Sequence, residues 1–244
     1  MQNLETRIAK WLKAKMKSAG AKGLVCGISG GLDSSVVAAL IKKAAPDNHL
    51  CLILPCYSLA SDIKDAQLAA KNFKLKTKTI HLCAVYDSLL KILPDASRLA
   101  KANLKARLRM LALYYFANKL NYLVVGTGNK SELMCVYFTK FGDRGVDLLP
   151  FGGLLKRDVR AIAGRLAVPQ AIIDKPPSAG LWIGQTDEGE MGVTYQELDA
   201  ILEGLEKNRK ADMPAALVDK VKEKMRLSKH KRNMAEIFDK EKQK

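Results

Sequence analysis

The chain has 244 residues, 48% of them hydrophobic, so it is long enough to bury the core of a whole domain. No apolar run reaches the length of a membrane span, and the N-terminal segment has helical spacing rather than a signal-peptide core. We therefore expect one cytoplasmic domain over residues 1–244. A net charge of +16, from 41 basic and 25 acidic residues, favours polyanionic partners, either nucleic acid or nucleotides.

Short apolar strands alternate with helical stretches in the first half of the chain. Ser61 is the expected N-cap of the second helix. The alternation predicts an α/β fold, a doubly wound parallel sheet with flanking helices. Ligands of such sheets bind beyond the carboxyl ends of the strands, so the loops after the first and fourth strands are candidate sites. In chain order, the expected elements are strands at 23–29, 49–55, 76–82 and 121–128, and helices at 33–44, 61–73 and 102–120.

The pattern is looser after residue 128. Pro169 is expected to end one further helix. Residues 172–192 combine proline, glycine and acidic residues, which predicts a long functional loop with a flexible part near 178–192. The expected elements of this half are helices at 155–168, 194–207 and 214–228, followed by a basic C-terminal tail that contains "SKHKR".

The cysteines give no indication of a disulfide or a metal site. There are five of them, an odd number, and no pair has Cys-x-x-Cys spacing. Most lie in apolar runs, so we expect reduced and buried thiols. The five are Cys26, Cys51, Cys56, Cys83 and Cys135.

The loop after the first strand reads "GISGGLDSS", residues 27–35. It has neither the Walker A nor the Rossmann spacing. Gly30 and Gly31 let backbone amides converge, and the following helix adds its N-terminal dipole, so we expect the loop to bind phosphate. Asp33 would repel phosphate unless Mg²⁺ lay between them. It could instead cap the helix, but a cap does not require the glycine pair, so we favour the magnesium interpretation.

The sequence Ser-Gly-Gly-x-Asp-Ser after a strand resembles the loop of the ATP pyrophosphatases, which cleave ATP between its α and β phosphates. Three later blocks resemble, in the same order, those of the ammonia-dependent NAD synthetases within that superfamily. The resemblance covers almost the whole chain. The blocks are "NLKARLRMLALYYFANKLNYLVVGTGNKSEL", "YFTKFGDRGVDLLP" and "DKPPSAGLWIGQTDE".

This resemblance implies an adenine nucleotide alpha hydrolase-like fold and a defined reaction. Deamido-NAD would be amidated to NAD with ATP and ammonia, through an NAD-adenylate and with release of AMP and pyrophosphate. It also implies Mg²⁺ and a homodimer whose interface helps to build the substrate site. A glutamine-dependent enzyme would carry a glutaminase domain, and the few residues before Gly27 leave no room for one. The expected nitrogen source is therefore ammonia itself or a separate glutaminase.

Site residues are carried over from the resemblance position by position. Asp33 and Glu132 would share Mg²⁺, and Lys156 would offset charge as pyrophosphate leaves, so these three are the implied catalytic residues. Taken alone, Glu132 would be an ordinary acid at a helix start. The implied ATP contacts are Gly27, Ile28, Ser29, Gly30, Gly31, Leu32, Asp33, Ser34, Thr127, Lys156 and Ser178. The implied contacts to deamido-NAD are Arg107, Lys140, Asp143, Asp147, His230 and Lys231.

The chain departs from the family pattern near the nicotinate end of the implied site. It carries Cys135 and Val136 where a small glycine is common, and Arg144 where glycine is common in "GDRGVD". Arg144 stands between two implied substrate residues. We expect it to add positive charge where the substrate carboxylate binds.

Two other functions fit the phosphate loop. A tRNA-modifying adenylating enzyme of the same superfamily would account for the basic charge, but it usually needs a cysteine pair for sulfur relay. No basic helix interleaved with aromatic residues marks an RNA surface, so nucleic acid is not an expected partner. A non-enzymatic nucleotide sensor would need neither the pair of Asp33 and Glu132 nor a loop that covers the site.

Overall fold

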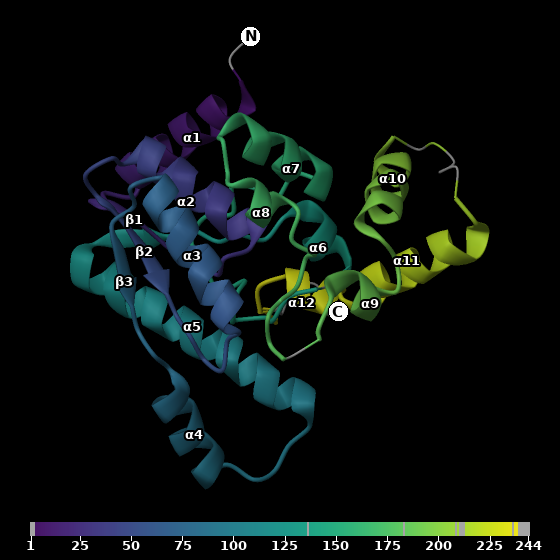
Figure 1. Cartoon of the computed structure of the whole chain (residues 1–244). Coiled ribbons are helices and arrows are strands. Elements are labelled where there is room, and N and C mark those ends of the chain that lie inside the picture. The colour runs from purple at the N-terminus through teal and green to yellow at the C-terminus, as the bar shows by residue number, and fades with distance from the viewer. Residues whose placement is uncertain are drawn as a thin grey trace.

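A parallel sheet lies at the centre of the computed structural model, in the strand order β3-β2-β1-β4 (Figure 1). The strand order reverses direction between β1 and β4, so the switch point of this doubly wound sheet lies there. The strands are β1 (Gly23–Gly27), β2 (His49–Ile53), β3 (Thr77–Thr79) and β4 (Tyr122–Val124). The structure describes residues 3–135, 137–182, 184–207, 209, 213–235 and 237–238.

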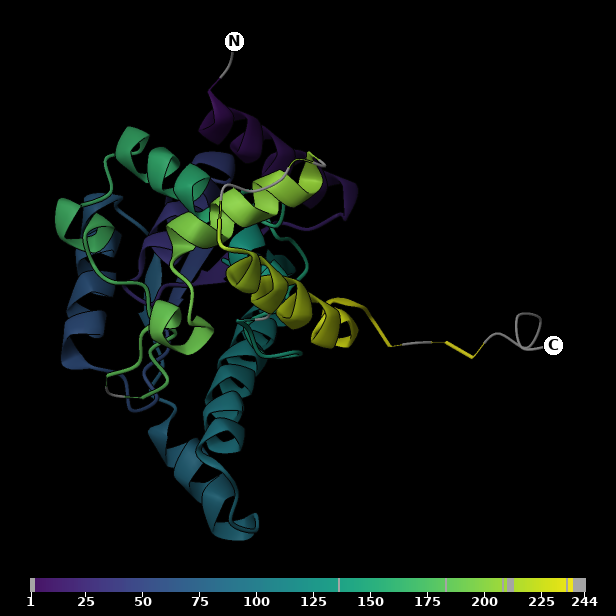
Figure 2. The same cartoon turned by 90° about the vertical axis from the view of Figure 1, so that its right-hand side faces the viewer.

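Helices cover both faces of the sheet, as expected. Side chains alternate along a strand, so Leu24 and Cys26 belong to one core and Val25 to the other. On the first face lie α1 (Leu4–Ser18), α2 (Leu32–Ala44), α3 (Ala60–Asn72), α7 (Lys156–Arg165) and α8 (Gln170–Ile173). On the second lie α4 (Cys83–Ile92) and α5 (Arg98–Leu120). Figure 2 shows α4 and the start of α5 projecting from the body as an arm.

The second half of the chain builds a further hydrophobic cluster beside the sheet. The helices that form it lie at the right of Figure 1. Leu155, the N-cap of α7, packs into this cluster. Lys156, the first residue of α7, is therefore held beside the cluster. The helices of the cluster are α6 (Lys130–Cys135), α9 (Asp187–Met191), α10 (Tyr195–Glu206) and α11 (Ala215–Leu227), and α12 (Lys229–Arg232) follows α11.

Several element boundaries differ from the expectation. Leu59, not Ser61, is the N-cap of α3, because the helix already begins at Ala60. Helix α7 ends at Arg165, because Ala167 adopts the left-handed conformation with φ 54°. Pro169 then serves as the N-cap of α8. The helices α4, α6, α8, α9 and α12 were not expected. Four of them, α6, α8, α9 and α12, have only four to six residues, too few for a recognisable period. Helix α4 has ten residues and is mostly apolar, so its pattern was available in the sequence.

The cysteines agree with the expectation, because all five are free and all but Cys83 are buried. Cys26 and Cys51 are paired in register on neighbouring strands, with their sulfur atoms 3.8 Å apart. Within the described ranges, no helix is both long and apolar enough to cross a lipid bilayer.

Candidate active site

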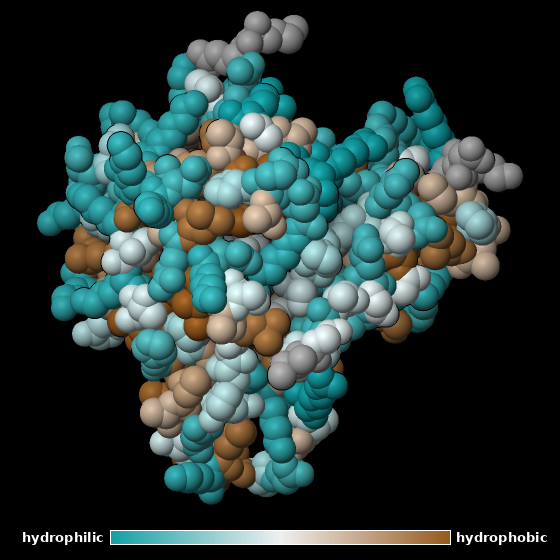
Figure 3. All heavy atoms as spheres, viewed as in Figure 1, coloured by the Kyte–Doolittle hydropathy of each residue, from teal (hydrophilic) through white to brown (hydrophobic). Residues whose placement is uncertain are grey.

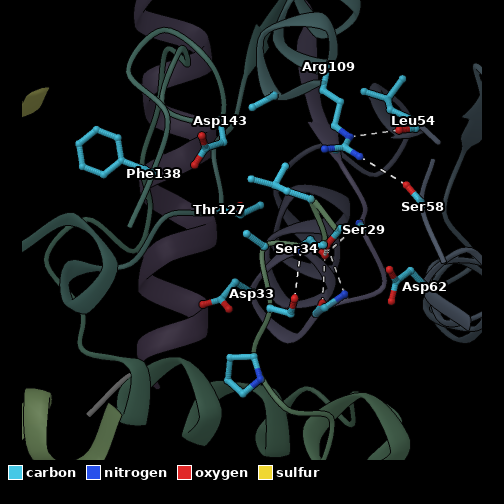
Figure 4. A pocket seen from close by; sticks show the side chains of 18 of the residues that line it. Ser29, Asp33, Ser34, Leu54, Ser58, Asp62, Arg109, Thr127, Phe138 and Asp143 are labelled. Carbon is cyan, nitrogen blue, oxygen red and sulfur yellow. Dashed lines mark hydrogen bonds between the residues drawn. The ribbon is translucent and has the colours of Figure 1, made fainter. Parts of the chain in front are cut away.

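A cavity of about 700 Å³ lies beyond the carboxyl ends of β1, β2 and β4, where the switch point places a ligand site. Figure 4 shows Asp33, Ser34 and Thr127 in its middle, with Asp143 and Phe138 to one side and Asp62 to the other. The loop residues 27–29 and 31–34 line it, so most of the sequence that was expected to bind phosphate faces this cavity.

Gly30 does not line the cavity but fixes the shape of the loop. Its φ of +83° lies in the left-handed region, and a Cβ atom there would be 2.3 Å from the backbone oxygen of Asp62. The loop therefore packs against the first turn of α3, which only glycine permits. By contrast, a Cβ at Gly31 would meet only Ser29 Oγ at 3.4 Å.

Serine hydroxyls hold the rest of the loop. Ser34 Oγ accepts from the Ser29 amide at 3.2 Å and donates to the Gly31 carbonyl at 3.0 Å. Ser35 Oγ donates to the same carbonyl at 2.8 Å. The first amides of α2 have no partner within the helix, so this rigid turn presents donors for an anion.

Asp33, Glu132 and Lys156 converge from three different elements. The Lys156 ammonium contacts Asp33 Oδ2 and lies 3.2 Å from Glu132 Oε1. Asn129 supports both carboxylates. Its side-chain Nδ2 donates to Asp33 Oδ1 at 3.0 Å, and its backbone amide donates to Glu132 Oε2 at 3.2 Å. Ser131 Oγ accepts from the Lys156 amide at 3.0 Å and so fixes the start of α7. The three implied catalytic residues thus form one buried ionic cluster.

The sequence analysis missed two members of this cluster, Asp187 and Tyr195. The Tyr195 hydroxyl lies 2.9 Å from Asp187 Oδ2 and 3.2 Å from Glu132 Oε1. Its ring lies 4.8 Å from the Lys156 ammonium, a cation–π contact. Asp187 was visible only as an acid in a glycine-rich loop, and Tyr195 only as an apolar helix residue, so neither pattern indicated the cluster.

The cluster changes the acidity of its members. Burial raises the pKa of Glu132 to about 7 against the opposing charge of Lys156, while Asp33 and Asp187 raise it further. Burial likewise raises the pKa of Asp187. For Lys156, burial opposes the charge, but Asp33 and Glu132 outweigh it and raise the pKa of the ammonium. The cluster therefore holds a protonated Lys156 beside Glu132 and Asp187, two carboxyl groups whose pKa values are raised.

The donor set fits a magnesium ion only with a phosphate ligand present. In the part of the chain that the structure describes, no group of three His, Cys, Asp or Glu residues is arranged to hold a metal. Asp33 and Glu132 offer two carboxylates, and Oδ1 of the nearby Asp187 is buried without a hydrogen-bond partner among the described residues. Mg²⁺ commonly takes one or two carboxylates and completes its shell with phosphate oxygens and water, which suits these residues.

The residues implied to bind deamido-NAD are divided by the structure. Asp143 and Lys231 line the cavity, as does Ser178 of the implied ATP contacts. Four others lie outside its lining: Arg107, Lys140, Asp147 and His230.

Those four residues have structural contacts of their own. Arg107 is exposed on α5, with Nη2 3.4 Å from the Lys140 carbonyl. Asp147 accepts from the Val124 amide at 2.7 Å and from the Tyr114 hydroxyl at 2.9 Å, which binds its carboxylate to the edge of the sheet.

Besides Lys156, the cavity wall contains a cationic group that was not expected from the sequence, Arg109. Arg109 donates from Nε to the Leu54 carbonyl at 3.2 Å and from Nη2 to Ser58 Oγ at 3.4 Å, as the dashed lines in Figure 4 show. Both acceptors follow β2. The arginine therefore fastens α5 to the end of that strand, in contact with the cavity.

The segment 178–182 covers part of the cavity and is held by α5. Lys105 Nζ donates to the Leu181 carbonyl at 2.9 Å, and the Arg98 guanidinium lies 4.3 Å from the Trp182 ring centre. Ile183, inside the expected flexible loop, lies outside the described residues, as does Val136 of the nicotinate-side departure.

Lys175, just before the covering segment 178–182, ties the chain to α3. The Lys175 ammonium lies 2.7 Å from Asp62 Oδ1 and 2.5 Å from Asp65 Oδ2. Because Asp62 also packs against Gly30, the phosphate loop, α3 and the covering segment are connected.

Fold and site together define an α/β nucleotide-binding protein, with an anion loop at the switch point and a buried ionic cluster beside it. Residues 4–235 match the family NAD synthase, and the chain belongs to that family. It is 49% identical over 236 residues to an NH(3)-dependent NAD(+) synthetase from Carboxydothermus hydrogenoformans, covering 95% of each chain.

Solved structures agree with this membership. An NMN synthetase from Francisella tularensis has a TM-score of 0.90 at 38% identity, with 96% of each chain covered. An NH3-dependent NAD synthetase from Campylobacter jejuni has a TM-score of 0.84 at 29% identity, with 97% of each chain covered. The predicted fold class and family are thereby confirmed.

Proposed function

We propose that the protein is an ammonia-dependent NAD synthetase, which converts deamido-NAD, ATP and ammonia into NAD, AMP and pyrophosphate. The observation that carries the proposal is the convergence of Asp33, Glu132 and Lys156 at the mouth of the Gly27–Ser35 loop. Relatives named NH(3)-dependent NAD(+) synthetase, at 42–49% identity, support the same reaction.

In this proposal the phosphate loop holds the β and γ phosphates of ATP. The rigid turn fixed by Ser34 and Gly30 supplies donors that need no rearrangement when charge develops. The nicotinate carboxylate attacks the α phosphorus, and the P–O bond to pyrophosphate breaks. Lys156 offsets the charge that accumulates as pyrophosphate departs, because its ammonium is buried and kept protonated by its neighbours.

Asp33 and Glu132 are the residues that would hold Mg²⁺, with phosphate oxygens completing its shell. A bound Mg²⁺ would neutralise phosphate charge. Lys156 lies between these carboxylates, so its ammonium has to shift toward the phosphates when ATP binds.

The second half-reaction needs a dry site. Ammonia attacks the acyl carbon of the NAD-adenylate, the bond to AMP breaks, and the amide remains. Water would hydrolyse the same adenylate. The segment that contains Leu181 and Trp182 is anchored to α5 over the cavity, which suits the exclusion of water.

A second copy of the chain would complete the site for the dinucleotide, because four of the residues implied to bind it lie outside the cavity lining. Leu111 is 64% exposed and Tyr115 is 60% exposed on α5, the helix that also presents Arg107. Brown hydrophobic residues are visible on the projecting arm in Figure 3, where Ile92 and Leu99 are exposed. We propose a homodimer through α5, with Arg107, Lys140, Asp147 and His230 near the interface. Light scattering coupled to size exclusion tests the dimer.

The deciding experiment incubates the protein with ATP, Mg²⁺, deamido-NAD and either ammonium or glutamine. We expect equal amounts of NAD, AMP and pyrophosphate with ammonium, and far less product with glutamine. Formation of ADP would contradict the adenylate route. Nicotinate mononucleotide is tested in parallel, because one similar structure is an NMN synthetase. A clear preference for the mononucleotide would mean that it, and not the dinucleotide, is the substrate. If no nicotinate substrate supports ATP turnover, a non-enzymatic nucleotide sensor would be favoured.

A further inference from the structure

Arg144 lies in the loop that precedes Leu148 at the edge of the sheet, and it contacts α12 near the C-terminus. Its Nη2 donates to the Arg232 carbonyl at 3.2 Å, and its guanidinium lies 5.0 Å from the centre of the Phe138 ring. It does not line the cavity, whereas Phe138 does. The expectation that Arg144 adds charge directly to the substrate pocket therefore does not match its position.

The acceptor of this bond is a carbonyl at the end of α12, and a second cation binds the carbonyl two residues earlier in the same helix. Lys140 Nζ donates to the His230 carbonyl at 2.8 Å. The last carbonyls of a helix have no partner within it, and α12 has only four residues to contribute stability of its own. Lys140 and Arg144 thus act together as a cap supplied by another segment.

The backbone that carries Arg144 is itself fixed. The Gly145 amide donates to the Gly142 carbonyl at 2.9 Å, and the Gly142 amide donates to the Thr139 carbonyl at 2.9 Å. A Cβ atom at Gly145 would lie 2.8 Å from Met110 Cγ of α5. Arg144 therefore reaches the C-terminal segment from a rigid turn that packs on a long helix.

Lys231 lies between the two capped carbonyls and lines the cavity. The segment carries several adjacent positive charges, including Lys229, Lys231 and Arg232, which repel one another in the absence of a ligand. Holding α12 through its carbonyl oxygens fixes Lys231 without neutralising it. The lysine remains charged for an anionic ligand.

We propose that Arg144 is a positioning residue for the nicotinate substrate: it caps α12 and thereby places Lys231 in the cavity before the substrate binds. This inference rests on the proposed function for its kinetic consequence, but not for its structural one. A preorganised lysine spares the substrate the entropy cost of ordering the segment. Loss of the cap therefore raises KM for the nicotinate substrate while ATP binding and the chemical step are preserved.

The test compares Arg144→Met with Arg226→Met. Methionine retains apolar contact with Phe138 but removes the guanidinium. Arg226 is an exposed residue of α11 that pairs with Glu223 at 2.7 Å, so its variant matches the change in charge. In the protein without substrates, we expect amide hydrogen exchange in residues 225–235 to accelerate about tenfold in Arg144→Met and not in Arg226→Met.

In steady-state assays we expect Arg144→Met to raise KM for deamido-NAD about tenfold, with kcat and KM for ATP changed less than about twofold. Lys231→Ala should raise the same KM, and the double variant should lose little more, because both changes remove one interaction. Arg144→Lys should recover part of the loss, since an ammonium can still donate to the carbonyl. If Arg144→Met does not fold, the exchange and KM measurements on Arg144→Lys test the proposal instead.

Unchanged exchange together with unchanged KM in Arg144→Met would overturn the proposal, and so would additive losses in the double variant. If the wild-type protein forms no NAD at all, the proposed function fails. The exchange measurement still decides whether Arg144 orders α12.

Discussion

The hydroxyl of Tyr195 lies 2.9 Å from Oδ2 of Asp187, and this contact joins α10 to α9 at the wall of the cavity. Within the described part of the chain, the other oxygen of Asp187 is buried without a hydrogen-bond partner, so the donor from Tyr195 matters for this carboxylate. We predict that Tyr195→Phe lowers the free energy of unfolding by about 1–3 kcal/mol, the cost of leaving a buried acceptor unsatisfied.

Urea denaturation measures this loss, with Tyr115→Phe as the matched control. Tyr115 is 60% exposed on α5, so its hydroxyl should contribute less than about 0.5 kcal/mol, and phenylalanine keeps the ring that the proposed dimer would bury. Equal stability of the two variants would remove the structural role of the Tyr195 contact.

The pKa of Glu132 gives a prediction for stability against pH. Burial raises this pKa to about 7, above the 4.5 of an unperturbed Glu. The folded protein therefore binds the proton more tightly than the unfolded chain does. The stabilising contribution is complete below about pH 4.5 and is lost as the pH rises to about 7.

Denaturant titrations of the wild type and of Glu132→Gln between pH 4 and pH 9 test this linkage. The free energy of unfolding of the wild type relative to the variant should fall up to about pH 7 and then stay level. In parallel, kcat/KM for ATP should rise through the same pH range, because magnesium needs the ionised carboxylate. A difference independent of pH would contradict the raised pKa.

Removal of Lys156 should expose the magnesium site. Lys156→Met leaves Asp33 and Glu132 buried beside each other without their cation, which should abolish turnover and lower stability by about 3–5 kcal/mol. With ATP present to complete the metal shell, millimolar Mg²⁺ should then raise the melting temperature of this variant more than that of the wild type, since the ion replaces the ammonium.

Lys207→Met is the control for this experiment. Lys207 has a side chain that is 53% exposed and pairs with Glu203, so its loss should change neither stability nor the response to Mg²⁺ appreciably. A Lys156→Met variant that ignores Mg²⁺ would count against the metal assignment of Asp33 and Glu132.

Gly30→Ala should disable the phosphate loop. The substitution strains a φ of +83° and places Cβ 2.3 Å from the Asp62 oxygen, so the loop or α3 must move. We expect at least about 2 kcal/mol of destabilisation and loss of ATP affinity measured by calorimetry. Gly153→Ala is the control, because nothing lies within 4 Å of a Cβ there and its φ is not in the left-handed region. ATP binding retained in Gly30→Ala would contradict the role of the turn.

The sheet and its long helices were predictable because short apolar runs alternate along the chain with longer apolar stretches of helix-forming residues. The buried strand at Gly23–Gly27 and the apolar helix Leu32–Ala44 are of this kind. Helix α6 was not predictable, because its six residues span less than two turns and carry no period. Its place is set by packing against α10 and α11, which is a tertiary effect.

For the site, the sequence indicated Asp33 through the unusual presence of an acid in an anion-binding loop. Glu132 and Lys156 came from resemblance, and the structure brings them to Asp33 although Lys156, for example, is 123 residues away in the sequence, a separation that no local pattern records. Asn129, Asp187 and Tyr195 could not be found, since an amide, a loop acid and a helix phenol are ordinary at those positions. Only the fold reveals that they share one buried polar network.

Val125 and Leu148 are paired at the edge of the sheet, so the chain leaves and returns at neighbouring positions. The Gly126 amide donates to the Leu148 carbonyl at 2.8 Å, and the Asp147 amide donates to the Val124 carbonyl at 3.0 Å, which closes the base. The stretch between these two points therefore begins and ends at the same edge of the sheet, and it contains both Glu132 of the ionic cluster and Arg144, the proposed cap of α12. The ionic cluster and the C-terminal side of the site are thus positioned from one segment whose two ends are joined.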